Sequence, residues 1–148
     1  MKTVIGLLCL LLLWASPVAE AATVGYVPMD DRPVNLEYVG DSVRAARIGI
    51  VTPSESLIAG RERPGDVPGL WQWVFAQAAT ADALVVSTDS LIYGGLVASR
   101  THELQAEELQ RRLAMFRQLK QKHPSLRLYV FGTIMRTPKM SAGATEPR

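Results

Sequence analysis

The chain is poor in cysteine and histidine, with one cysteine and two histidines among its 148 residues. Cys9 lies in an apolar run near the start of the chain, which we predict is removed as a signal peptide. The mature chain would then form no disulfide and no thiolate metal site. His102 and His123 stand at opposite ends of one predicted helix, about 30 Å apart at 1.5 Å per residue, so they cannot share a metal ion. We therefore expect stability to come from a packed apolar core.

The chain also lacks an apolar run long enough to cross a membrane. Residues 4–14 are apolar apart from Gly6, whereas about 20 residues are needed to span a bilayer. Lys2 precedes this run, and the small residues Ala19 and Ala21 follow it at the spacing of a cleavage site. The pattern predicts a secretory signal peptide over residues 1–21 and export to the periplasm or the extracellular space. No stable membrane span is expected after cleavage.

Clustered positive charge is absent as well. The 16 basic and 14 acidic residues give a net charge of +2, and they are spread along the chain. Nucleic-acid binding requires a basic stripe or patch, so this class of function is excluded. The partner that the sequence favours is a small polar or carbohydrate ligand, and the oligomeric state stays open.

Apolar segments alternate between strand and helix patterns along the rest of the chain. We predict strands at residues 24–29, 47–51, 83–87 and 126–133, and helices at 35–46, 70–79 and 102–123. A capping-box pattern at residues 52–55 predicts an additional helical turn. The third strand is apolar without alternation, which is typical of a strand covered on both faces. This order predicts parallel strands joined by right-handed crossovers.

The predicted fold class is therefore α/β, with a parallel sheet of alternating strand–helix units. Four such strands would form the first portion of a larger domain, either barrel-like or open and doubly wound. One edge of the sheet would otherwise lack a partner, and natural domains cover such edges. We expect residues 22–140 to be the amino-terminal part of a truncated α/β domain, with residues 141–148 as an irregular tail.

Polar side chains follow the predicted strands, where parallel strands bring them to one edge of the sheet. The candidates are Asp30, Asp31, Arg32 and Asn35 after the first strand, Asp89, Tyr93, Gly94 and Arg100 after the third, and Arg136 after the fourth. Carboxylates facing arginines suit general acid–base chemistry or the binding of a polar substrate.

Three aspartates are the catalytic candidates. Side chains alternate along a strand, so Asp30 and Asp31 should point to opposite sides. We favour Asp31 with Asp89 as the acid–base pair and keep Asp30 as the third candidate. The substrate-binding candidates are Arg32, Asn35, Tyr93, Gly94, Arg100 and Arg136.

Structural roles compete with these assignments. Residues 30–33 could form a capped turn with an internal ion pair, and Asp89 could cap the turn that follows it. Gly94 and Gly95 could form a tight turn with positive φ. A divalent cation held by the three aspartates is conceivable, but with no histidine near them we assign no metal ligand and leave the cofactor open. Trp71 fits the core better than a stacking platform.

Three strand-end segments carry a resemblance to a known family. Residues 26–35 run YVPMDDRPVN, residues 87–100 run STDSLIYGGLVASR, and residues 133–136 run TIMR. In this order they resemble a bacterial family of uncharacterised proteins, domain-of-unknown-function family 4127. The resemblance implies a longer protein, on the order of a few hundred residues, of which this chain is the amino-terminal part. It implies no established reaction.

Three functional hypotheses follow. The first is an exported hydrolase that acts on a polar substrate, such as a carbohydrate, through its strand-end carboxylates. The second is a non-catalytic periplasmic or surface protein that binds an anionic ligand with the same arginines. The third is an inactive truncated fragment. The sequence leaves open whether the protein is an enzyme.

Overall fold

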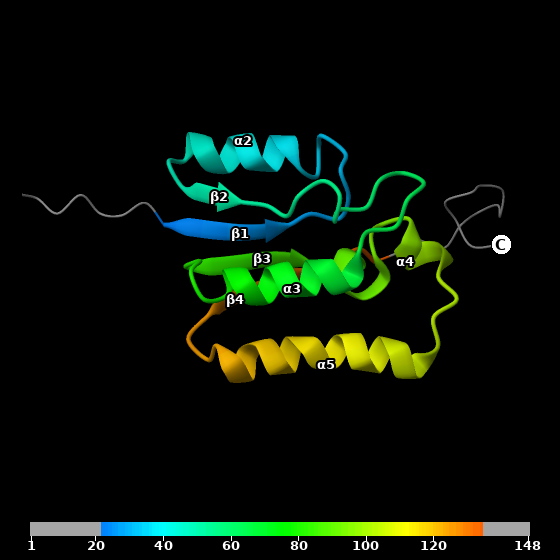
Figure 1. Ribbon diagram of the computed structural model, residues 1–148. Coiled ribbons are helices and arrows are strands. Elements are labelled where there is room, and N and C mark those ends of the chain that lie inside the picture. Colours follow the sequence, from blue (N-terminus) through cyan, green and yellow to red (C-terminus); the bar gives the residue numbers. More distant parts are fainter. Residues whose placement is uncertain (1–21, 135–148) are drawn as a thin grey trace, which may run out of the picture.

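A computed structural model describes residues 22–134 of the chain (Figure 1). The signal peptide and tail predicted from the sequence, and Arg136, lie outside the described residues. The strands are β1 (Thr23–Val27), β2 (Gly49–Val51), β3 (Ala83–Ser87) and β4 (Arg127–Phe131). The helices are α2 (Glu37–Ala45), α3 (Val67–Gln77), α4 (Ala98–Thr101), α5 (Ala106–Lys122) and the short π-helix η1 (Asp89–Tyr93).

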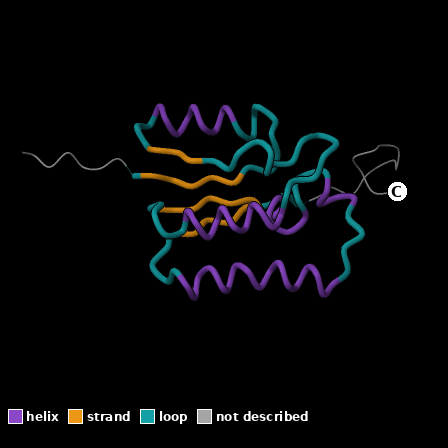
Figure 2. The backbone as a smooth tube through the Cα atoms, viewed as in Figure 1, coloured by secondary structure: helices purple, strands orange, loops and turns teal. Residues whose placement is uncertain are grey.

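The four strands form one parallel sheet in the order β2-β1-β3-β4. This confirms the predicted α/β class, and of the two predicted architectures the sheet has the open one. The chain moves from β1 to β2 in one direction and then crosses back over β1 to reach β3 (Figure 2). The strand order therefore reverses between β1 and β3, which is the position where open α/β sheets bind ligands.

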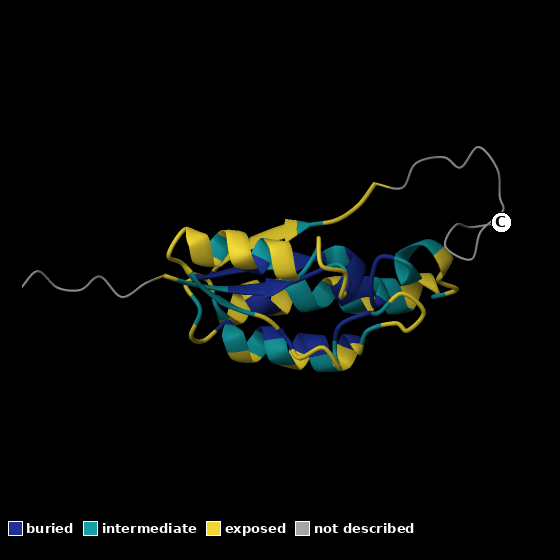
Figure 3. Cartoon of the chain, turned by 90° about the horizontal axis from the view of Figure 1, so that it is seen from above, coloured by how far each residue is buried: buried dark blue, intermediate teal, exposed yellow. Residues whose placement is uncertain are grey.

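The core lies between the sheet and the helices α3 and α5. Leu84 and Val86 of β3 pack with Leu70 of α3 and Leu119 of α5, and all four side chains are buried. The central strands are accordingly the most deeply buried part in Figure 3, whereas much of α2 is exposed. Right-handed crossovers place α2 on the face opposite to α3 and α5.

Trp71 connects three elements of this core. Its ring meets Phe116 of α5 edge to face, with ring centroids 4.8 Å apart. Its indole N–H donates to the carbonyl of Leu91 in η1 at 3.0 Å. The prediction that Trp71 belongs to the core is confirmed, and through it the core fixes the position of η1.

Two local predictions differ from the structure in detail. The helix predicted at residues 102–123 is present as α5 but begins only at Ala106, because His102 and Gln105 have extended backbone angles. The capping-box pattern at residues 52–55 begins no regular helix but is followed by a turn, in which the N–H groups of Leu57 and Ile58 donate to the carbonyls of Ser54 and Glu55. The carbonyls of Glu55 and Ser56 also accept hydrogen bonds from the Arg63 guanidinium.

Within the described residues, no helix combines the length and apolar character needed to cross a membrane.

Leu84→Ala tests the position of the core. Leu84 is fully buried in β3, so its truncation should lower the free energy of unfolding by about 2–5 kcal/mol. Leu113→Ala on the exposed side of α5 is the matched control and should cost about 0.5 kcal/mol or less. Urea unfolding followed by tryptophan fluorescence measures both variants. Equal losses would contradict this assignment of the core.

Candidate functional site

The loops that follow β1, β2 and β3 meet at the carboxyl edge of the sheet. Hydrogen bonds between backbone groups hold the three loops together, and the hydroxyl of Ser90 donates to the carbonyl of Pro28 at 2.5 Å. The backbone pairs are Asp31 N–H with Ala59 O, Leu96 N–H with Met29 O, and Gly65 N–H with Gly94 O. Side chains on these loops therefore have fixed positions relative to one another.

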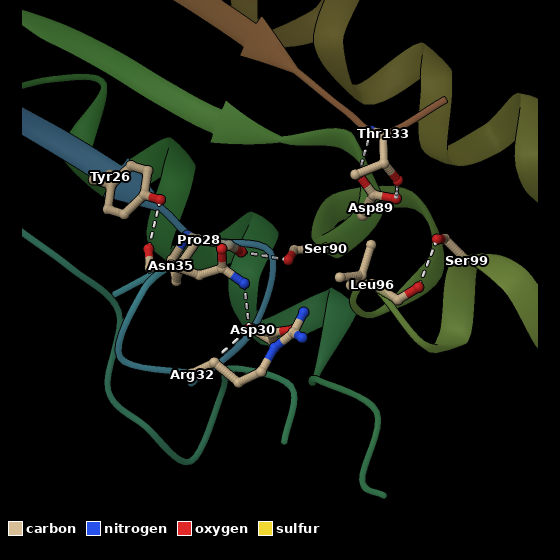
Figure 4. A network of polar contacts seen from close by, with 10 residues as sticks. All are labelled: Tyr26, Pro28, Asp30, Arg32, Asn35, Asp89, Ser90, Leu96, Ser99 and Thr133. Carbon is tan, nitrogen blue, oxygen red and sulfur yellow. Dashed lines mark hydrogen bonds and ion pairs between the residues drawn. The ribbon is translucent and has the colours of Figure 1, made fainter. Parts of the chain in front are cut away.

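Asp30 is one of two buried carboxylates at this edge, the other being Asp89 (Figure 4). Its Oδ2 accepts hydrogen bonds from Arg32 Nε at 2.9 Å and Arg32 Nη2 at 2.8 Å. Its Oδ1 accepts from Asn35 Nδ2 at 2.6 Å and from the backbone N–H of Arg32 at 3.2 Å. We call Asp30, Arg32 and Asn35 the Asp30 cluster. Each oxygen thus already accepts from two donors. Asp30 therefore holds the side chains of Arg32 and Asn35 in place.

The electrostatics of the cluster follow from burial and hydrogen bonding. Burial alone raises the pKa of Asp30, but the hydrogen bonds from Arg32 and Asn35 outweigh it, and the pKa is lower than that of an ordinary aspartate. The same hydrogen bond raises the pKa of Arg32. Burial, followed by the charge of Asp30, raises the pKa of Tyr26. Tyr26 thus stays a neutral donor, and its hydroxyl binds the carbonyl of Asn35 at 2.6 Å.

Asp31 makes none of the side-chain hydrogen bonds of the Asp30 cluster, although its charge adds to the effects that raise the pKa of Arg32. It is exposed, and its carboxylate lies against Gly60 in the loop after β2. A Cβ atom on Gly60 would stand 3.1 Å from Oδ2 of Asp31. Asp31 is therefore a solvent-facing carboxylate beside the loops of the carboxyl edge.

Asp89 is buried and bound to the segment that follows β4. Its Oδ1 accepts from the Thr133 hydroxyl at 2.9 Å, and its Oδ2 accepts from the Thr133 backbone N–H at 3.0 Å. The suggestion that Asp89 caps the next turn is wrong, because both of its oxygens accept from Thr133, and the side chain that accepts from this turn, at the N–H of Ser90, is the hydroxyl of Ser87. Asp89 joins η1 to the end of β4.

The structure thus brings some predicted site residues together and separates others. Asp30, Arg32 and Asn35 form one cluster, and the internal ion pair suggested for residues 30–33 is present. Asp31 and Asp89 have different surroundings, and within residues 22–134 no hydrogen bond joins them. Arg100 lies on α4, and its Nε has no hydrogen-bond partner among the described residues.

The three aspartates do not assemble a metal site. Within the part of the chain that the structure describes, no three histidine, cysteine, aspartate or glutamate side chains come together as metal ligands. The hypothesis of a cation held jointly by Asp30, Asp31 and Asp89 is therefore wrong.

A cleft lies between residues 59–68 and the segment from Tyr93 to Leu104. We call it the loop cleft. Its first compartment has a volume of about 420 Å³ and includes Gly60 and Gly94 in its wall. The second, of about 480 Å³, includes Tyr93, His102 and Arg112. The two share Pro64, Ala98 and Thr101.

Gly94 lines the first compartment of the cleft, and Gly95 follows it in the same turn. Their φ angles are +91° and +130°, in the region that favours glycine. A Cβ on Gly95 would also collide with Cβ of Ala59. The predicted tight turn is present, and it turns the chain from η1 toward α4. His102 and Arg112 were missed as cleft residues, because only the break between α4 and α5 brings them here.

A protein-family model matches residues 24–148 and is described as "Protein of unknown function (DUF4127)". The chain belongs to this family. The resemblance noted from the sequence is thereby confirmed. No curated protein matches the chain. In this DUF4127 chain, residues 26–35 and 87–100, which carried the resemblance, supply the Asp30 cluster and one wall of the loop cleft.

Asp30→Asn tests the electrostatics of the cluster. The folded pKa of Asp30 is lowered, so its stabilisation is complete above the unfolded value of about 4 and is lost as the pH falls through the folded value. At pH 7 the wild-type chain should exceed Asp30→Asn in unfolding free energy by about 1–3 kcal/mol. The difference should shrink steadily on acidification below about pH 4.

Urea unfolding at a series of pH values measures this difference. Asp31→Asn is the matched control, because it removes the neighbouring exposed carboxylate, and it should change stability by about 0.5 kcal/mol or less. A stability difference for Asp30→Asn that is independent of pH would contradict the ion pair as its cause.

Proposed function

We propose that the carboxyl edge of the sheet binds a small polar ligand, with Arg32 as its principal contact. The observation that supports this proposal is that the Arg32 side chain is both held in place and exposed. Asp30 holds its guanidinium by Nε and Nη2, yet the side chain is 52% exposed. Arg32 is therefore oriented by the protein and open to solvent at the same time.

The chemistry of arginine indicates what such a group recognises. A guanidinium has five N–H donors in one plane, and Asp30 engages the Nε donor and one on Nη2. The remaining donors suit a ligand with adjacent acceptor oxygens, such as a carboxylate or the hydroxyls of a sugar. Because the group is already held in place, little side-chain freedom is lost on binding.

A hydrolase is the second candidate, and the exposed carboxylate of Asp31 favours it. Asp31 follows Asp30 directly and stands beside Gly60, in the wall of the loop cleft. An exposed carboxylate next to a bound substrate is placed to act as a general base toward water. In this proposal Asp31 is the catalytic residue, and Asp89 is a positioning residue because Thr133 uses both its oxygens.

Binding and hydrolysis are separated by one experiment. Thermal shifts of the chain with glucuronate, glucose and cellobiose should reveal stabilisation by at least one of them. Arg32→Ala should weaken that binding by about tenfold or more, whereas Arg44→Ala, an exposed arginine of α2 paired with Asp41, should leave it unchanged. Equal affinities for both variants would exclude Arg32 as the contact.

The fate of the ligand decides between the two candidates. Cellobiose recovered intact after long incubation supports a binding protein. Cleavage by the wild-type chain that is lost in Asp31→Asn supports the hydrolase.

We also propose export of the protein, supported by the composition of residues 1–21. Expressed at full length in a bacterial host, the chain should appear outside the cytoplasm with Ala22 as its first residue. Mass spectrometry of the recovered protein measures this terminus. Recovery of the uncleaved chain in the cytoplasm would contradict export.

A further inference from the structure

The second compartment of the loop cleft has an aromatic wall. The rings of Tyr93 and His102 are stacked, with centroids 4.6 Å apart and planes inclined by 29°. Nδ1 of His102 accepts a hydrogen bond from the backbone N–H of Leu104 at 3.3 Å. In the neutral imidazole the proton therefore resides on Nε2, which makes this nitrogen a donor.

Arg112 supplies a second fixed donor group in the same compartment. Its side chain is only 20% exposed. Its Nε donates to Glu108 at 2.6 Å, and its Nη1 donates to the carbonyl of Ile92. These contacts hold the guanidinium in the wall between α5 and the end of η1.

The charges of the compartment limit the class of ligand. Asp66, Glu103 and Arg112 line it, so the carboxylates outnumber the guanidinium two to one. A phosphate or another strong anion is disfavoured by this balance. A hydrocarbon is disfavoured as well, because the lining combines carboxylate acceptors with guanidinium and imidazole donors.

We propose that the loop cleft is a carbohydrate-binding site, in which the stacked pair of Tyr93 and His102 offers its outer face to a sugar ring. A sugar ring combines an apolar C–H face, which packs on aromatic rings, with hydroxyls that both donate and accept. His102 and Arg112 would donate to those hydroxyls, and Asp66 and Glu103 would accept from them. The compartment volume of about 480 Å³ lies in the range of small-molecule sites.

The two compartments together indicate an oligosaccharide rather than a single sugar. They share Pro64, Ala98 and Thr101, so a ligand can extend from one into the other. The first compartment reaches Gly60, which adjoins Asp31. The inference deepens the proposed function, because it names the ligand class and places a second ring beside the candidate catalytic carboxylate.

Titration of the full chain with cellobiose, maltose and diacetylchitobiose, measured by calorimetry, tests this inference. At least one of them should bind at about 10 mM or below. Tyr93→Ala should weaken binding by about tenfold, and Tyr93→Phe should retain it. Tyr129→Ala, which removes an exposed ring on β4, is the matched control and should bind as the wild-type chain does.

A second variant covers the case in which Tyr93→Ala does not fold. His102 is exposed, so His102→Ala should keep the melting temperature of the wild-type chain and should also weaken disaccharide binding. In the wild-type chain the Nε2–H resonance of His102 should shift on addition of the bound disaccharide.

The outcomes distinguish this inference from the proposed function. Binding that is lost in Arg32→Ala but unchanged in Tyr93→Phe, Tyr93→Ala and His102→Ala would overturn the inference and leave the role of Arg32 standing. Binding lost in the Tyr93 and His102 variants but kept in Arg32→Ala supports the inference and removes Arg32 as the contact. Binding of choline with no response to any disaccharide would overturn the inference in favour of a cation site.

Discussion

The ion pair between Asp30 and Arg32 is the constraint on which the carboxyl edge depends. A buried carboxylate is costly unless charge and hydrogen bonds compensate for its lost hydration. Arg32 and Asn35 provide this compensation, and Tyr26 holds the backbone of Asn35. Because the carboxylate needs both partners, its hydrogen bonds restrain the loop after β1. The exposed direction of the guanidinium follows from this restraint.

The position of this loop relative to the rest of the edge has a different cause. The strand order reverses between β1 and β3, so the loops that follow these two strands diverge from neighbouring positions. Two contacts keep the loops together. The Ser90 hydroxyl donates to the Pro28 carbonyl, and Gly95 can lie close to Ala59 because it has no Cβ atom. Polar groups that are distant in sequence therefore share one side of the molecule, and the loop cleft lies along that side.

The sequence was sufficient for the strands and for the place of the candidate site, but not for the surroundings of each aspartate. Strand β3 matches its prediction at residues 83–87, since a short apolar run has one stable position in a parallel sheet. The alternation of side chains along a strand predicted that Asp30 and Asp31 point to opposite sides. It did not predict which of them is buried, because the burial of Asp30 depends on the hydrogen bonds from Arg32 and Asn35. The partner of Asp89 lies 44 positions away at Thr133, and no local pattern encodes such a contact.

The break between α4 and α5 is the clearest case in which tertiary structure overrides local preference. Residues 102–123 have helical periodicity, and continuation of the helix through 102–105 would have satisfied its backbone groups. These helical hydrogen bonds are absent. His102 stacks on Tyr93 instead, and the backbone N–H of Leu104 donates to Nδ1 of the His102 imidazole. Departures from local preference concentrate where function requires a particular geometry. The break leaves His102 stacked on Tyr93, and both residues line the second compartment of the loop cleft.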